Sequence, residues 1–141
     1  MNWMQVALEE ASKAYEAEEV PVGAVLVRDR ELIAQAHNVM YRTKNPLNHA
    51  ERLVIERGLH CLSSNHLRGC ELYVTLEPCH MCAGAIALVG IERVFFGAYD
   101  PKLGQIDHNH HVLRHTPIVA MGGFLEEKCA SLLKSFFENR R

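Results

Sequence analysis

The chain has 141 residues, of which 48% are hydrophobic and 23% charged, and its formal net charge is −2 at pH 7. These values are typical of one globular domain, and no apolar run approaches the roughly 20 residues of a membrane-spanning helix. The near balance of charge excludes a general basic field, so any RNA contact has to come from a local patch. Glutamates rather than basic and apolar residues fill the start of the chain, unlike a secretory signal, and we expect a single cytoplasmic domain over residues 1–141.

The first part of the chain predicts a helix followed by a pair of strands. Apolar residues at helical spacing predict a helix over 3–18, which Pro21 prevents from continuing. Residues 22–27 form an almost unbroken apolar run, typical of a buried strand. A polar turn follows, and we expect its second strand, 31–38, to pair with the first in the antiparallel sense.

The second half of the chain predicts a strand–helix–strand crossover, a shorter strand and a last helix. The two strands of the crossover should be parallel, because such connections return in the same direction and are right-handed. Together with the antiparallel pair they predict a three-layer α/β/α fold with a mixed five-stranded sheet flanked by helices. The predicted elements are a helix over 49–60, a strand over 71–76, a helix over 79–89 closed by Gly90, strands over 93–97 and 118–121, and a helix introduced by Gly122 and Gly123.

Two short motifs carry side chains that bind zinc. His49 and Glu51 lie at the start of one predicted helix, and Cys79 and Cys82 follow Pro78 at the start of another. One imidazole and two thiols supply three ligands and leave the fourth tetrahedral position open for water, as in catalytic rather than structural sites. Glu51 is the acid/base group that such a water needs. The motifs therefore predict a hydrolytic zinc centre.

Helix geometry separates the roles of these residues. The step from Cys79 to Cys82 puts both sulfurs on one side of a first helical turn, where backbone N–H groups and the helix dipole lower thiol pKa values. Two residues in a helix step round by roughly 200°, so His49 and Glu51 cannot share a regular face. We therefore place His49 at the helix cap, directed at the metal, and Glu51 within reach of the water. His80 points away from the cysteine face and is expected to be exposed.

Other interpretations of the cysteine pair stay open. A C-x-x-C pair inside a strand–helix unit can be redox-active, which would make the chain a non-enzymatic metal or redox module using Cys79 and Cys82. The pair can also be half of a closed zinc finger, although the sequence contains no second C-x-x-C pair to complete one. Glu51 separates these interpretations, because a redox or metal-holding module has no need of it.

The motifs and the segments around them resemble the bacterial tRNA-specific adenosine deaminases, of the zinc-dependent cytidine/deoxycytidylate deaminase superfamily with its H-x-E and P-C-x-x-C pattern. The resemblance extends from about residue 3 to the C-terminus. It implies a cytidine-deaminase-like fold, one zinc ion per subunit held by His49, Cys79 and Cys82, and a homodimer. The segments that carry it are Pro21 to Val27, His49 to Glu51, Thr75 to Ala85, Phe96 to Ala98 and Phe136 to Arg141.

The resemblance also implies a reaction. A zinc-bound hydroxide would attack C6 of adenine at the wobble position of a tRNA anticodon, hydrolysing a cyclic amidine C–N bond to give inosine and ammonia. Glu51 would shuttle the protons, Asn38 would hydrogen-bond the target nucleotide, and the backbone N–H of Ala50 would help to hold the base. A deaminase of a free nucleobase such as guanine or cytosine is the alternative, because it shares the P-C-x-x-C core.

The C-terminal segment supplies the residues expected to contact RNA. Phe136 falls on the apolar stripe of the last helix and is expected in the core, whereas Phe137 lies beside that stripe and is the better candidate to stack on a base. Arg140 and Arg141 add positive charge at the same end. A packing role for the aromatic pair is an equally open alternative.

Three segments differ from the family pattern. Residues 45–48 read NPLN, where the family usually has Asp-Pro-Thr-Ala or similar, and Arg52 stands where an apolar residue is usual. Residues 103–111 also differ from the common version with small residues. None of these positions belongs to the zinc motifs, but the RNA contacts of the loop 98–117 stay open.

Overall fold

A computed structural model describes residues 1–106, 113 and 116–140 of the chain. Five strands form one sheet in the order β2-β1-β3-β4-β5. β1 pairs antiparallel with β2 and β3, whereas β3, β4 and β5 are parallel neighbours. The predicted mixed sheet is confirmed, including the parallel pair around the crossover. The strands are β1 (Gly23–Arg28), β2 (Glu31–His37), β3 (Cys70–Leu76), β4 (Arg93–Ala98) and β5 (Val119–Met121).

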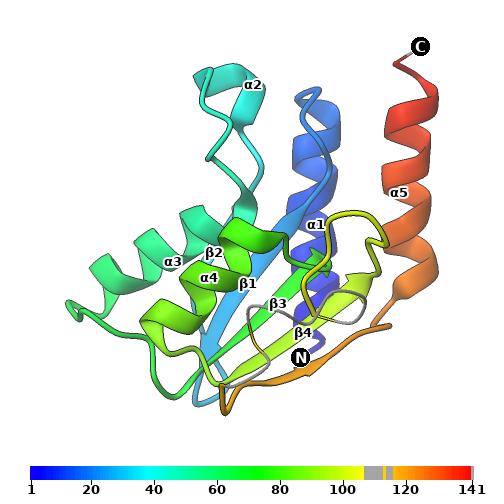
Figure 1. Cartoon of the computed structure of the whole chain (residues 1–141). Coiled ribbons are helices and arrows are strands. Elements are labelled where there is room, and N and C mark those ends of the chain that lie inside the picture. Colours follow the sequence, from blue (N-terminus) through cyan, green and yellow to red (C-terminus); the bar gives the residue numbers. More distant parts are fainter. Residues whose placement is uncertain (107–112, 114–115, 141) are drawn as a thin grey trace.

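Helices cover both faces of the sheet (Figure 1). α1 and α5 lie on one face, and α3 and α4 lie on the other, which confirms the three predicted layers. α2 was not predicted from the sequence, because a helix of four residues is too short to show an apolar period. Within the described ranges, no helix is long and apolar enough to cross a membrane. The helices are α1 (Trp3–Glu16), α2 (Met40–Thr43), α3 (Ala50–Cys61), α4 (His80–Val89) and α5 (Glu126–Glu138).

β1 is buried on both faces and separates two hydrophobic clusters. Ala24 and Leu26 belong to the cluster on the side of α3 and α4, whereas Val25 and Val27 belong to the cluster under α1. Gly23 allows α1 to approach the strand closely, because a Cβ at this position would lie 2.0 Å from a backbone oxygen of that helix. Burial on both faces explains why residues 22–27 read as an unbroken apolar run.

The topology brings the predicted site segments to one edge of the sheet. β2 and β3 both run antiparallel to β1, so their C-terminal ends lie at the same edge. Asn38 directly follows β2, and Cys79 follows β3 after two intervening residues. The N-terminal ends of α3 and α4 lie at this edge as well, and α2 lies beyond it (Figure 1).

Candidate active site

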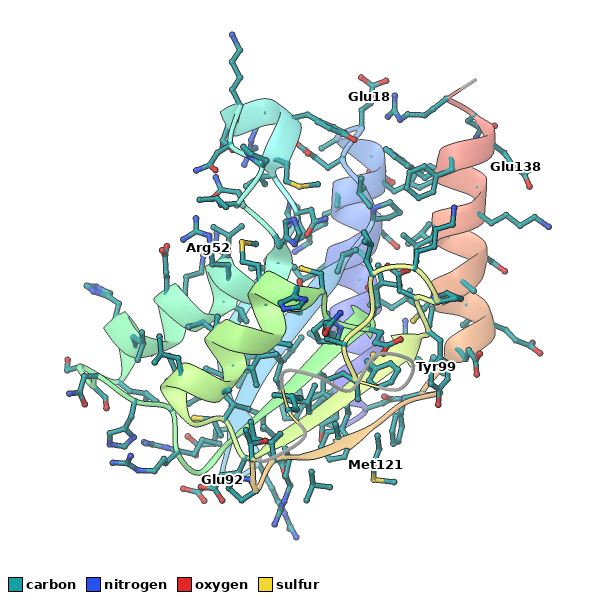
Figure 2. The ribbon with its side chains drawn as sticks, viewed as in Figure 1. Glu18, Arg52, Glu92, Tyr99, Met121 and Glu138 are labelled. Carbon is teal, nitrogen blue, oxygen red and sulfur yellow. The ribbon has the colours of Figure 1, made fainter. Side chains whose placement is uncertain are left out.

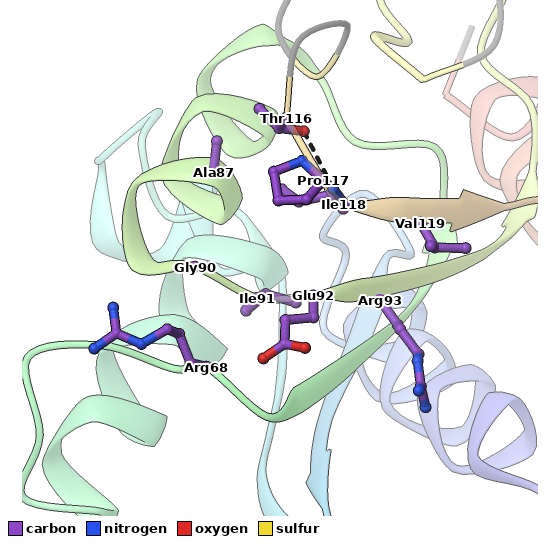
Figure 3. A pocket seen from close by; sticks show the side chains of 10 residues that line it. All are labelled: Arg68, Ala87, Gly90, Ile91, Glu92, Arg93, Thr116, Pro117, Ile118 and Val119. Carbon is purple, nitrogen blue, oxygen red and sulfur yellow. Dashed lines mark hydrogen bonds between the residues drawn. The ribbon is translucent and has the colours of Figure 1, made fainter.

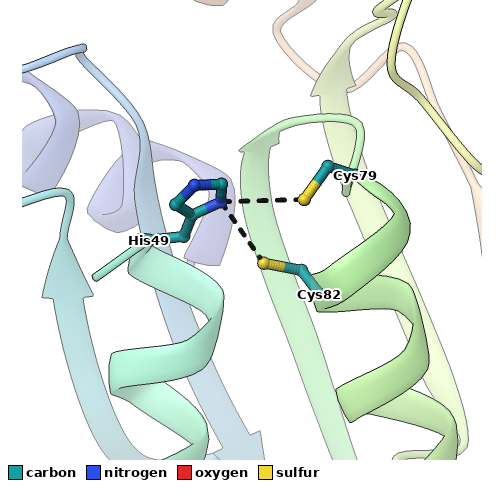
Figure 4. A group of neighbouring side chains, drawn as sticks. All are labelled: His49, Cys79 and Cys82. Atoms are coloured by element: carbon teal, nitrogen blue, oxygen red, sulfur yellow. Dashed lines mark hydrogen bonds between the residues drawn. The ribbon is translucent and has the colours of Figure 1, made fainter. Parts of the chain in front are cut away.

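The three predicted zinc ligands come together between α3 and α4 (Figure 4). His49 Nδ1 lies 3.7 Å from Cys79 Sγ and 3.5 Å from Cys82 Sγ, and the ligand atoms all lie within 4.8 Å of one another. A tetrahedral zinc ion, with bonds of about 2.0 Å to nitrogen and 2.3 Å to sulfur, holds such atoms about 3.6 Å apart. The three side chains therefore fit zinc, and among the described residues they form the only metal-binding group of this kind.

Helix caps direct two of these ligands. His49 is the N-cap of α3 and Cys79 the N-cap of α4, and both have extended backbones. The position expected for His49 at the cap is what the structure shows. A hydrogen bond at Pro46, whose only backbone hydrogen-bonding group is the carbonyl, holds the His49 ring. Such a bond commonly orients a histidine that binds metal.

The two thiols differ in acidity. A hydrogen bond from Cys82 outweighs burial and, with the His49 ring, lowers the pKa of Cys79 to about 4. The pKa of Cys82 is raised, because Cys79 is adjacent and the side chain is buried. The expectation that the helix start lowers both thiol pKa values is therefore wrong for Cys82. Two thiolates side by side repel each other, and a dication between them relieves that repulsion.

Glu51 lies in the first turn of α3 with a side chain that is almost inaccessible, at 4% relative exposure. Burial is the main reason why its pKa is raised to about 7, and the charge of Cys79 raises it further. The carboxyl also forms a hydrogen bond with Cys82. A carboxyl group with a pKa near neutral can both take up and release a proton at physiological pH.

A cavity of about 280 Å³ joins these groups. Two of the metal ligands, His49 and Cys79, line it together with Glu51 and Asn38. α2 and α5 contribute apolar side chains, so the cavity combines an apolar wall with a few polar groups, as ligand sites do. Its lining residues are Val20, Val22, Asn38, Met40, His49, Glu51, Leu76, Glu77, Cys79, Asp100, Leu103, Leu133 and Phe137.

The two groups expected to hold the base bond to each other. The Ala50 N–H donates to Asn38 Oδ1 over 2.7 Å in a buried hydrogen bond. This N–H belongs to the uncapped first turn of α3, since the N-cap His49 makes no side-chain capping bond. The structure therefore uses the Ala50 N–H to orient Asn38 rather than leaving it free for a base. With its oxygen engaged, Asn38 has its amide nitrogen left to offer as a donor.

A buried carboxylate not foreseen from the sequence holds the loop on the other side of the cavity. Glu77 accepts hydrogen bonds from the N–H groups of Asp100, at 3.0 Å, and Ile106, at 2.9 Å. Two residues of this loop, Asp100 and Leu103, line the cavity. The sequence signal is a glutamate at the end of an apolar strand, directly before the Pro-Cys motif, but its partners cannot be read from local patterns.

The C-terminal residues expected to contact RNA differ in their exposure to solvent. Phe136 is 3% exposed, as expected for the core, whereas Phe137 is 55% exposed and lines the cavity. The guanidinium carbon of Arg140 lies 4.3 Å from the centre of the Phe136 ring. Arg141 lies outside the described residues, as does part of the loop 98–117. His80 is exposed, as expected.

Two of the departures from the family pattern contact each other. Arg52, near the start of α3 (Figure 2), donates from Nε to the Leu47 carbonyl at 2.7 Å and also binds the Asn48 side chain. Asn48 in turn donates to Thr43 Oγ1 at 2.8 Å. The two unusual segments therefore form one network that ties the loop before His49 to α3.

A second cavity, of about 530 Å³, lies at the other end of α4 (Figure 3). Arg68, Ile91, Glu92, Arg93 and Ile118 are among its lining residues. Two of its charged side chains already have partners. Arg93 forms an ion pair with Glu71 on β3, and Glu92 accepts a hydrogen bond from the Gly69 N–H. No residue predicted for the active site lies in it.

Comparison with known proteins places these features in a family. Residues 1–98 match the family model described as the cytidine and deoxycytidylate deaminase zinc-binding region. The chain is 44% identical over 143 residues to a tRNA-specific adenosine deaminase of Bacillus subtilis, with 99% of this chain and 89% of the relative covered.

Solved structures agree with this assignment. A structure from studies of A-to-I editing by tRNA:A34 deaminases superposes with a TM-score of 0.88 at 39% identity, covering 92% of this chain and 97% of the other. A guanine deaminase from Bacillus subtilis superposes with a TM-score of 0.67 at 34% identity, covering 70% of this chain and 66% of the other. The chain therefore belongs to the zinc-binding cytidine and deoxycytidylate deaminase family and, within it, to the family of the tRNA-specific adenosine deaminases.

Proposed function

We propose that the chain is a zinc-dependent hydrolase that converts adenosine to inosine at the wobble position of tRNA anticodons. One observation carries the proposal: two of the three grouped zinc ligands, His49 and Cys79, line one cavity of about 280 Å³ together with Glu51, Asn38 and the exposed Phe137. The relatives named for adenosine deamination in tRNA support the substrate, because they cover nearly the whole chain.

His49 Nδ1 and the sulfurs of Cys79 and Cys82 would hold the zinc ion. When bound, zinc supplies Lewis acidity, which brings the pKa of a coordinated water down to about 7. The hydrogen bond at Pro46 keeps the His49 ring in the orientation that its ligand role requires.

Glu51 moves the protons. Its carboxylate takes a proton from the attacking water, delivers it to the adenine ring nitrogen and assists departure of ammonia. Burial favours this role, since it raises the pKa of Glu51 to about 7, so that the carboxyl exchanges protons easily near neutral pH. Adenosine and water are consumed, and inosine and ammonia are formed.

Asn38 binds the target nucleotide through its amide nitrogen. The 2.7 Å hydrogen bond from Ala50 engages the amide oxygen, and so sets which side of the group remains for the substrate. Ala50 therefore acts through Asn38. Phe137 provides an exposed ring on which a neighbouring base can stack.

Deamination of a free nucleobase is the second candidate, and the likeness to a guanine deaminase structure favours it. The cavity argues for the larger substrate, because α2 and α5 line it with Met40, Leu133 and an exposed Phe137. A free nucleobase, unlike an RNA substrate, has no neighbouring nucleotides that could contact these side chains.

The deciding experiment uses the purified, zinc-loaded chain and an anticodon stem-loop with adenosine at the wobble position. We expect inosine at that position by mass spectrometry and one ammonia per inosine. The matched control is the same stem-loop with guanosine at the wobble position, which should release no ammonia. Release of ammonia from free guanine without inosine in the stem-loop would favour the second candidate.

We further infer a homodimer. α4 consists almost entirely of apolar residues, yet it covers only one face of the sheet, and Leu88 on it is 88% exposed. Surface helices normally carry a polar outer face, and an apolar one marks an interaction surface. A second copy of the chain would cover it.

We also propose that residues 1–141 form a single domain that works in the cytoplasm. Contacts of both α1 and α5 with the sheet, and with each other, support one domain. Zinc-binding thiols need to stay reduced, which the cytoplasm allows.

A further inference from the structure

The segment after β2 forms one wall of the cavity. Asn38 and Met40 line the cavity directly, and the exposed side chains of Tyr41 and Arg42 follow on α2. Under the proposed function, an RNA strand that leaves the cavity runs past this segment. The position of α2 therefore affects how well RNA binds.

α2 needs support from elsewhere in the chain. A helix of four residues is not stable by itself, and its N-cap, Val39, makes no side-chain capping bond. The carboxylate of Glu19 takes over this function. Its Oε1 accepts the Tyr41 N–H at 2.9 Å, and its Oε2 accepts the Arg42 N–H at 2.8 Å. One carboxylate thus binds the two donors that an N-cap side chain normally serves.

The end of α1 directs Glu19 inward. Glu18 has φ 63°, and its N–H donates to the Tyr15 carbonyl, while the Glu19 N–H donates to the Ala14 carbonyl at 2.8 Å. This is the hydrogen-bond pattern of a Schellman motif. Glu18 lies at the top of α1 in Figure 2, and the next residue is turned into the protein, where it is 1% exposed. Val20, the next residue again, lines the cavity.

We propose that Glu19 is a positioning residue for RNA binding, whose buried carboxylate holds α2, and with it Asn38 and Met40, at the cavity. The inference rests on the proposed function and adds a residue to it. Glu19 is not among the lining residues of the cavity, so it acts only through the segment that it holds. Its loss should weaken RNA binding while zinc and the Glu51 chemistry remain.

The test compares Glu19→Gln with Glu10→Gln in the full-length, zinc-loaded chain. Both glutamates are buried and hydrogen-bonded, but Glu10 binds Gln35 and His37 on β2, and none of these three residues lines the cavity. Glutamine keeps the shape and one acceptor oxygen, but its NH2 group cannot accept the second backbone N–H, so one of the two bonds is lost and the other loses its charge. We expect Glu19→Gln to raise KM for the stem-loop roughly tenfold, with kcat per zinc changed less than about twofold. Glu10→Gln should lower Tm without raising KM.

Amide hydrogen exchange tests the same contact without depending on activity. The amides of Tyr41 and Arg42 should be protected in the wild-type chain and lose protection in Glu19→Gln, while amides of β1 stay protected. If Glu19→Gln does not fold, exchange in the wild-type chain tests the contact instead. Slow exchange of these two amides would support the hydrogen bonds to Glu19, and fast exchange would overturn the proposal.

The outcomes separate this inference from the proposed function. An active wild type with unchanged KM in Glu19→Gln overturns the positioning role alone. An equal rise of KM in both variants also overturns it, because lost stability would then explain the effect. A folded wild type that makes no inosine overturns the proposed function, and the assignment to RNA binding falls with it.

Discussion

Asn38 Oδ1 accepts a 2.7 Å hydrogen bond from the backbone N–H of Ala50, and this bond joins the end of β2 to the first turn of α3. It does two things at once. It satisfies a helix N-terminal donor that the N-cap leaves open, and it orients the amide of a cavity residue. The residue that we propose binds the nucleotide is therefore held by the same helix that carries Glu51.

Replacing Asn38 by aspartate should separate these two functions. Asp keeps an oxygen acceptor for the Ala50 N–H but has no amide donor for the substrate. We expect kcat/KM for the stem-loop to fall about 10- to 100-fold, the effect of losing one buried hydrogen bond of roughly 1.5–3 kcal/mol. Zinc content and Tm should stay close to wild type. Asn38→Ala also removes the acceptor and should in addition destabilise the fold by about 1 kcal/mol. Full activity of Asn38→Asp would exclude the amide donor.

Glu51→Gln should retain zinc and lose turnover. The side chain keeps its shape but can no longer carry a proton, and proton transfer by a positioned group contributes about 10²- to 10⁴-fold. Zinc per chain by elemental analysis and ammonia release would be measured on the same sample. His49→Ala is the control, and it should lose zinc as well as activity. A redox or metal-holding module using Cys79 and Cys82 predicts instead that Glu51→Gln leaves function intact.

Gly104→Ala should loosen the loop that Glu77 holds. A Cβ at this position would lie 2.3 Å from Glu77 Oε1, so the buried carboxylate and its hydrogen bonds have to shift. We expect a loss of about 1–3 kcal/mol of stability, measured by urea unfolding, because buried polar groups would lose partners. Gly84→Ala is the control. It has no atom within 4 Å of the new Cβ and lies inside α4, so alanine should leave stability unchanged or raise it by up to about 1 kcal/mol.

Acid should destabilise the chain partly through Glu10. Burial raises the pKa of this carboxyl, but hydrogen bonds from Lys13, His37 and Gln35 together outweigh burial and lower it below its ordinary value of 4.5. A lowered folded-state pKa means that the stabilisation is present above about pH 4.5 and is lost as the pH falls through the folded-state value.

Unfolding free energies at pH 7 and pH 4 would measure this loss. Glu10→Gln should be less stable than wild type at pH 7 by about 1–3 kcal/mol, and the difference should shrink toward pH 4. Comparing the two chains cancels the effect of acid on the zinc ligands, which both share. A difference that does not depend on pH would contradict the role of the Glu10 charge.

Leu88→Asp should convert a dimer into a monomer. A charge on the exposed apolar face of α4 would have to be buried against the second copy without a partner, which is costly. Light scattering after size exclusion should show a fall from twice 15.9 kDa to 15.9 kDa. Leu32→Asp, on the edge strand β2, is the control, because Leu32 is also exposed but lies away from α4. A wild-type chain that is monomeric would contradict the homodimer.

Local patterns determined much of this protein. The apolar run of β1, the helical stripe that separates Phe136 from Phe137, and the glycine that closes α4 all act within a few residues, so their consequences can be read from the sequence. The zinc ligands were also predictable, because the chemistry requires those residue types and each motif lies at a helix start.

Only the tertiary structure decided which distant groups meet. Asn38 with Ala50, Glu77 with the loop around Asp100, and Glu19 with α2 are contacts between segments that no local period connects. The raised pKa of Cys82 has the same origin, since it depends on burial and on the neighbouring sulfur rather than on the helix start alone. The sequence determined the chemical groups of the site, whereas the fold determined how backbone donors and buried carboxylates hold them. Hydrogen bonding and burial depend on distances in space, and these distances cannot be read from the separation of residues along the chain.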